Sequence, residues 1–135
     1  MDDRRTDAVR AQFGPAAAAY LASATHAAGE DLGHVVAFLD PRPDDRILDL
    51  GCGVGHTLRR VAPLVRQAVG CDATAGMLAG ARALMAQEGI TNVTLVVADA
   101  MALPFAAGEF DGVTCRLAAH HFADAARAFA EVARV

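Results

Sequence analysis

The sequence predicts an α/β protein with a Rossmann-like, doubly wound parallel sheet. Short apolar or β-branched segments alternate with helical segments from residue 46 onwards, which is typical of parallel strands joined by helices. A glycine-rich stretch, ILDLGCGVGHT at residues 47–57, ends the first of these segments, where such sheets bind ligands. The length of 135 residues, 54% of them hydrophobic, fits one globular domain.

Helices are expected before the first strand. The segment from Thr6 to about Leu39 has helical composition, with a break at Gly14-Pro15 and a further interruption near Gly29. Apolar residues at 32, 35, 36 and 39 recur at helical spacing and predict a buried face. The stretch DPRPDD, residues 40–45, then ends the helix because its prolines do not continue one.

The remaining chain is expected to alternate regularly. The predicted strands cover residues 46–50, 67–72, 92–99 and 110–116. The predicted helices cover residues 55–62, 74–89 and 122–135. Pro63 ends the first of these helices, whereas Thr74 and Gly89 are the expected N-cap and C-terminal stop of the second.

Polar residues collect at the carboxyl ends of all four predicted strands. Residues 49–57 follow the first strand, Asp72 the second, Asp99 the third and residues 116–121 the fourth. In an open parallel sheet these ends lie on one edge, where the ligand binds. The sequence therefore predicts one binding site built from four separate segments.

The glycine stretch does not fit a phosphate-binding loop. Its spacing is GxGxG and not the GxGxxG of dinucleotide sites, and His56 stands where the third glycine would be. Asp49 would also face the diphosphate, and two charges at about 4 Å interact by about 4 kcal/mol at an effective dielectric near 20. A nicotinamide oxidoreductase is therefore disfavoured, and the absence of a Gly-Lys-Ser/Thr sequence excludes a P-loop.

A ligand with an ammonium group and a ribose, but without phosphate, fits these acids better. Asp72 lies 23 positions after Asp49 (72 − 49), in the range where an acid accepts hydrogen bonds from ribose hydroxyls. Asp99 ends the third strand on the same edge. The three acids are thus placed to contact an amine, a ribose diol and an exocyclic amino group.

Several stretches resemble the successive motifs of class I S-adenosylmethionine-dependent methyltransferases. They are ILDLGCGVGHT, VGCDATAGML, VVADAMALPFAAGEFDGVTCRLAAHHF and FAEVARV. The set is most similar to the type 11, or ubiquinone- and menaquinone-biosynthesis-like, group, and it runs in order from about residue 44 to residue 135. QFGPAAAAYLASATHAAGEDL resembles the N-terminal cap helices of one bacterial branch of that group.

The resemblance implies S-adenosylmethionine as the cofactor and a role for each strand end. The residues it assigns to the methionyl end, the ribose and the adenine are Asp49, Gly51, Cys52, Gly53, Asp72, Ala73, Met77, Asp99, Ala100 and Met101. Tyr20 matches a cap-helix tyrosine that reaches the cofactor carboxylate, with packing of the cap as its alternative. Thr57 is a further candidate, with a helix start as its alternative. Arg116 is another, as an anchor for an anion or, alternatively, as a strand-end contact with a helix.

His120 and His121 follow the fourth strand, where an acceptor would approach. A histidine acts as a general base at neutral pH, which is the catalytic hypothesis for either residue. The alternative is that one caps the last helix and the other packs against the fold. Transfer from a sulfonium depends mainly on in-line alignment, so a base is needed only for a protonated acceptor.

Composition excludes several other classes. The net charge of −4 without a basic tract argues against a nucleic-acid partner. No apolar run approaches the roughly 20 residues of a membrane helix, and the N-terminus lacks the apolar core of a signal peptide. The three cysteines have no CxxC spacing, so we expect no metal site and a reducing cytoplasmic location.

A single domain is expected, with cap helices over residues 1–40 and a cofactor-binding core over residues 44–135. Members of the resembled family continue into an L-x-P-G-G turn and three more strands, which this sequence does not contain. The family order 3-2-1-4-5-7-6 would then become 3-2-1-4, with strand four as an edge. Either the chain is a fragment, which we favour, or a homodimer completes the sheet.

The main hypothesis is S-adenosylmethionine-dependent methyl transfer to an oxygen, nitrogen or carbon nucleophile of a small-molecule acceptor. In this hypothesis the chain is the cofactor-binding portion of the enzyme. The alternative is a non-catalytic, methyltransferase-like module that binds the nucleoside or a partner protein.

Overall fold

The structure is a computed structural model of the whole chain, and it describes residues 7, 8, 10, 11, 16, 17, 19 and 29–135. Most of the expected cap helices, including Tyr20, lie outside the described residues. Within the described part of the chain, no helix has the length and hydrophobicity to cross a bilayer.

The described elements alternate as predicted from Glu30 onwards. The strands are β1 (Arg46–Leu50), β2 (Gln67–Asp72), β3 (Val93–Val97) and β4 (Gly112–Thr114). The α-helices are α4 (Glu30–Leu39), α5 (His56–Val61), α6 (Ala75–Gln87) and α7 (Ala125–Arg134). Two 3₁₀ turns, η1 (Ala62–Leu64) and η2 (Ala119–His121), follow α5 and precede α7.

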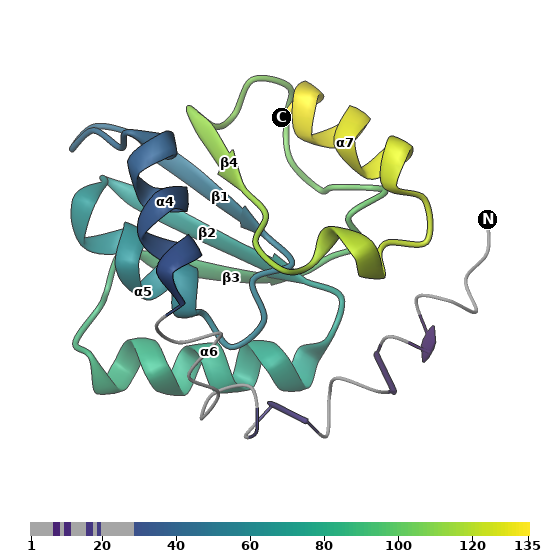
Figure 1. Cartoon of the computed structure of the whole chain (residues 1–135), viewed down its shortest axis with the longest axis horizontal. Coiled ribbons are helices and arrows are strands. Elements are labelled where there is room, and N and C mark those ends of the chain that lie inside the picture. Colours follow the sequence, from purple (N-terminus) through teal and green to yellow (C-terminus); the bar gives the residue numbers. More distant parts are fainter. Residues whose placement is uncertain (1–6, 9, 12–15, 18, 20–28) are drawn as a thin grey trace.

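The four strands form one parallel sheet in the order β3-β2-β1-β4 (Figure 1), which confirms the predicted topology. β1 is central, and its residue Asp49 lies opposite Gly70 of β2 and Thr114 of β4. Because the strands are parallel, their carboxyl ends meet at one edge of the sheet. The predicted site segments are therefore neighbours in space.

Two apolar clusters cover the two faces of the sheet. Ile47 belongs to the cluster that also contains residues of α5 and α6, with α4 residues packed against it. Leu48, the next residue of β1, belongs to the cluster that contains Ala128 of α7. This alternation follows from the period of two of a β-strand, and it places helices on both faces of the sheet (Figure 1). The Asp49 side chain, two residues after Ile47, lies on the same face of the sheet as the Ile47 side chain.

Several element ends differ from the predicted ones. β3 and β4 are shorter than residues 92–99 and 110–116, and α7 begins at Ala125 rather than at residue 122. The Asp124 carboxylate accepts the Arg127 backbone N–H at 3.0 Å and so caps α7 there. Thr74 does precede α6, but its side chain makes no capping hydrogen bond.

Gly70 is needed for close packing at the centre of the sheet. A Cβ atom there would lie 2.5 Å from Leu58 Cδ1 and 2.9 Å from Cys52 Sγ. Both side chains belong to the buried cluster beneath α5. A methyl group at this position would therefore push α5 and the glycine loop away from β2.

We expect Gly70→Ala to lower the free energy of unfolding by about 1–3 kcal/mol because it overpacks this core. The matched control is Gly33→Ala in α4, where a Cβ meets nothing within 4 Å. That change should stabilise the protein by about 1 kcal/mol through helix propensity. Urea denaturation followed by circular dichroism measures both. Equal effects of the two substitutions would contradict the packing argument.

Candidate functional site

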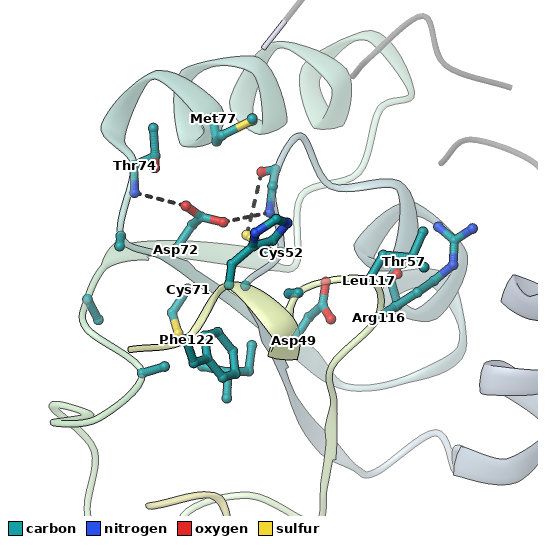
Figure 2. A pocket seen from close by; sticks show the side chains of 18 of the residues that line it. Asp49, Cys52, Thr57, Cys71, Asp72, Thr74, Met77, Arg116, Leu117 and Phe122 are labelled. Atoms are coloured by element: carbon teal, nitrogen blue, oxygen red, sulfur yellow. Dashed lines mark hydrogen bonds between the residues drawn. The ribbon is translucent and has the colours of Figure 1, made fainter. Parts of the chain in front are cut away.

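A cavity opens at the carboxyl edge of the sheet, and segments after all four strands line it (Figure 2). The predicted residues that line it are Asp49, Gly51, Cys52, Gly53, Thr57, Asp72, Ala73, Met77, Asp99, Ala100, Met101, Arg116 and His121. His120 is not among the lining residues, and Tyr20 lies outside the described part. The structure therefore brings predicted residues from four separate segments together at one cavity.

Other lining residues were not predicted as site residues. They are Leu50, Val54, His56, Cys71, Thr74, Ala98, Leu117, Ala118, Phe122 and Ala123. Most are immediate neighbours of predicted residues, so adjacency to a strand end could have identified them. Phe122 follows His121 directly, but the sequence pattern assigned Phe122 and Ala123 to the last helix, which begins only after Asp124.

The glycine loop after β1 turns through three left-handed residues. Gly51, Gly53 and Gly55 have φ of +66°, +55° and +92°, a region that glycine adopts without strain. A Cβ at Gly51 would also lie 2.6 Å from the Ala118 Cβ, so the segment after β4 packs directly on the loop. The glycines therefore permit both the left-handed turns of the loop and this close packing.

Asp72 fastens this loop to the end of β2. Its Oδ2 accepts the Gly53 N–H at 3.0 Å, and its Oδ1 accepts the Thr74 N–H at 2.8 Å (Figure 2). Burial raises the pKa of Asp72, and these two hydrogen bonds act in the opposite direction. Each carboxylate oxygen retains a second lone pair, so the group can also accept from a ligand hydroxyl.

Asp49 is almost completely buried, with 2% of its surface exposed. Its Oδ1 accepts a hydrogen bond of 2.8 Å from Thr114 Oγ1. Burial raises the pKa of Asp49 to about 7, Thr114 and the charge of Arg116 lower it, and the charge of Asp72 raises it further. A carboxyl in this state takes up a negative charge readily when a cation binds beside it.

Asp99 follows β3 in a tight turn. Its Oδ1 accepts the Met101 N–H at 2.9 Å, and its backbone carbonyl accepts the Ala102 N–H at 3.0 Å. Ala100 and Met101 are buried beside it, and all three residues line the cavity. The turn thus presents one carboxylate next to an apolar surface, which suits a flat heteroaromatic ring with an amino group.

Arg116 and the two histidines follow β4. Arg116 lines the cavity and forms an ion pair with Asp31 of α4, with Nε–Oδ2 at 2.6 Å and NH2–Oδ1 at 3.0 Å. The strand-end contact predicted as its alternative is therefore present. The His120 and His121 ring centroids lie 3.9 Å apart in η2, and the charge of His121 acts on Asp72. Asp124, not a histidine, caps α7.

The strand order and this cavity define a Rossmann-like domain of the class I methyltransferase type. The family model described as "Methyltransferase domain" matches residues 47–135. The chain therefore belongs to the methyltransferase domain family. The cofactor that the family and the fold indicate for this cavity is S-adenosylmethionine.

Three relatives illustrate the range of this similarity. The uncharacterised methyltransferase YcgJ of Bacillus subtilis is 43% identical over 109 residues, which cover 81% of this chain and 43% of YcgJ. Its crystal structure superposes with a TM-score of 0.75 at 41% identity over 77% of this chain and 44% of that one.

The demethylmenaquinone methyltransferase of Corynebacterium kroppenstedtii is 36% identical over 72% of this chain and 39% of its own length. The 23S rRNA (uracil(1939)-C(5))-methyltransferase RlmD of Xanthomonas campestris is 41% identical over 50% of this chain and 15% of its own length. The chain thus spans less than half the length of these relatives.

The pKa of Asp49 predicts an unusual pH dependence of stability. The folded pKa of about 7 exceeds the ordinary value of 3.8, so between these pH values the folded state holds a proton that the unfolded state has released. The contribution of Asp49 to the free energy of unfolding should therefore fall as pH rises through this window. Between about pH 4 and about pH 8, the free energy of unfolding of the unmodified chain should fall by about 4 kcal/mol relative to that of Asp49→Asn.

Urea denaturation of both proteins across this range measures the difference, in which the titrating groups that do not interact with Asp49 cancel. The same stability difference at both ends of the range would contradict the assigned ionisation of Asp49.

Proposed function

We propose that this chain carries the cofactor-binding portion of an S-adenosylmethionine-dependent methyltransferase that methylates an oxygen, nitrogen or carbon of a small-molecule acceptor. The observation that carries the proposal is the buried Asp49 carboxyl beneath a glycine loop that is itself fastened by Asp72. This arrangement suits a ligand that combines a cationic end with a ribose and has no phosphate.

Each strand end then has a part in binding. Asp49 accepts from the ammonium group, and the loop from Gly51 to Gly53 packs along the methionyl chain. Asp72 accepts from the ribose hydroxyls through the lone pairs that Gly53 and Thr74 leave unused. Asp99 accepts from the adenine amino group, Ala100 donates its backbone N–H to the ring, and Ala73, Met77 and Met101 pack against its faces.

Thr57, Cys52 and Arg116 complete the wall of the site, and Tyr20 is proposed to reach the cofactor carboxylate from the cap. When bound, S-adenosylmethionine supplies an electrophilic methyl group on a sulfonium. The protein then contributes alignment of the acceptor with that methyl and exclusion of water, which together account for most of the rate.

A small-molecule acceptor is favoured over a nucleic acid by charge. The net charge is −4, and the lining carboxylates Asp49, Asp72 and Asp99 would repel a phosphate backbone near the cavity. Similarity to the RNA methyltransferase covers half of the chain, so an RNA base is the competing acceptor. Residues 1–40 are proposed to form the cap that selects the acceptor over the core at residues 44–135.

Two further observations support proposals on the location of the protein in the cell and on how the β4 edge of the sheet is covered. The described cysteines Cys52, Cys71 and Cys115 are unpaired thiols, which suits the cytoplasm. β4 pairs with β1 on one side only, and Phe38 of α4 beside it is 89% exposed. We propose that further strands cover this edge, either from a longer chain or from the second copy of a homodimer.

Cofactor binding is the first test of the proposal. Calorimetry should show binding of S-adenosylmethionine and S-adenosylhomocysteine and none of NAD. Asp72→Asn should weaken both by about tenfold to a hundredfold, because an amide cannot accept from Gly53, Thr74 and the ribose together. The control Asp40→Asn changes an exposed acid in the left-handed region, which asparagine tolerates, and should leave affinity unchanged.

Binding of NAD alone would contradict the proposed cofactor. Tight nucleoside binding without methylation of any acceptor would favour the non-catalytic module instead.

A general base at His121 is the second test. His121 lines the cavity and His120 does not, so His121→Ala should reduce transfer to a hydroxyl or amine by about 10²-fold or more, while His120→Ala stays near the unmodified rate. The assay measures transfer of a labelled methyl group at pH 6–8. It uses the chain together with the further strands that are proposed to cover the β4 edge. An unchanged rate in His121→Ala would exclude His121 as the base.

A further inference from the structure

All three charged side chains of α7 form hydrogen bonds with backbone groups of the segment that follows β3 (Figure 1). Arg127 Nε donates to the Met101 carbonyl at 3.1 Å. Glu131 Oε2 accepts the Leu103 N–H at 2.8 Å, and Arg134 NH2 donates to the Leu103 carbonyl at 3.0 Å. Charged residues of a surface helix ordinarily face solvent, so this arrangement marks a specific attachment of α7 to that segment.

The attachment follows from the spacing of residues along α7. Arg127, Glu131 and Arg134 are four and three positions apart, so their side chains share one face of the helix. Ala128 lies next to them and is fully buried, in the apolar cluster that also contains Met101. The helix is therefore joined to the segment after β3 both by apolar packing and by hydrogen bonds.

Met101 is the residue of this segment that lines the cavity, and it is held at three points. Its N–H donates to Asp99 Oδ1 at 2.9 Å, its carbonyl accepts from Arg127, and its Sδ accepts the Asp124 N–H at 3.3 Å. The first contact lies within the turn, whereas the other two come from α7 and its N-cap. The helix thus holds the far side of the turn that carries Asp99.

The near side of the same turn is held by the sheet. The Ala98 N–H donates to the backbone carbonyl of Asp72, the last residue of β2, at 3.0 Å. β2 therefore determines where the turn begins. The directions of the Asp99 carboxylate and of the Ala100 N–H also depend on where the turn ends, which is the side that Arg127 holds.

We propose that Arg127 is a positioning residue for adenine recognition: it holds the Met101 carbonyl and so fixes the turn from which Asp99 and the Ala100 N–H meet the base. The inference rests on the proposed function and gives α7 a part in selecting the base of the nucleoside. Arg127 is not among the residues that line the cavity, so it acts through Met101 and not by contact with the cofactor.

The test compares two ligands that differ only in the base. They are S-adenosylhomocysteine and its inosine analogue, in which a carbonyl replaces the exocyclic amino group and the ring N1 carries a proton. Calorimetry with the unmodified chain should show a preference for the adenine ligand. Arg127→Leu removes the donor and keeps the helix propensity, and it should reduce this preference by about tenfold. Arg127→Lys keeps a donor and should retain most of the preference.

The matched control is Arg134→Leu on the same helix. It removes hydrogen bonds to the carbonyls of Leu103 and Phe105, neither of which lines the cavity. This change should lower the free energy of unfolding without changing the preference between the two bases. An equal loss of affinity for both ligands in Arg127→Leu, or the same change of preference in Arg134→Leu, would overturn the inference and leave Arg127 a structural role.

Amide hydrogen exchange in the ligand-free chain separates this inference from the proposed function. The Met101 N–H should exchange about tenfold faster in Arg127→Leu than in the unmodified chain, relative to the Leu48 N–H of β1, because the turn opens more often. Arg134→Leu should not produce this change. Unchanged exchange of the Met101 N–H in Arg127→Leu would overturn the inference. Failure of the unmodified chain to bind either ligand would contradict the proposed function instead, while the exchange rates still decide whether Arg127 fixes the turn.

Discussion

The burial of the Asp49 carboxyl is the constraint on which the rest of the site depends. An isolated buried carboxylate is costly, and the surrounding structure reduces that cost in two ways. Thr114 donates a hydrogen bond from β4, and Arg116 contributes a positive charge. The group nevertheless keeps a raised pKa, so a cation bound beside it would favour its ionised form further.

The same constraint makes this glycine loop a poor site for a phosphate. In phosphate-binding loops the backbone N–H groups point at the anion. In this loop the Gly53 N–H is donated to Asp72, and Asp49 lies buried at its base. The glycines therefore serve close approach and tight turns, and the electrostatic preference is reversed toward a cation. The two carboxylates thus make this loop better suited to a cationic group than to a phosphate.

The sequence predicted the central strands well because their signals are local, and most of the candidate site residues line one cavity. β1 and β2 coincide with the predicted ranges, and each acid follows a strand end whose position the topology determines. The extent of β4 and the start of α7 were wrong, since pairing along an edge and the Asp124 cap depend on three-dimensional contacts. The pair of Arg116 with Asp31 joins residues 85 positions apart, which no pattern in one sequence reveals.

The thiols raise a chemical question, because a cavity built for an electrophilic methyl group is lined by Cys52 and Cys71. Thiolates are strong nucleophiles, whereas neutral thiols are weak ones. Burial raises the pKa of both residues, that of Cys71 to about 12, and the charges of Asp49 and Asp72 raise them further. At neutral pH the thiolate fraction of Cys71 is then about 10⁻⁵. Burial, with a smaller contribution from the charges of the two acids, thus keeps both thiols in the form that resists methylation.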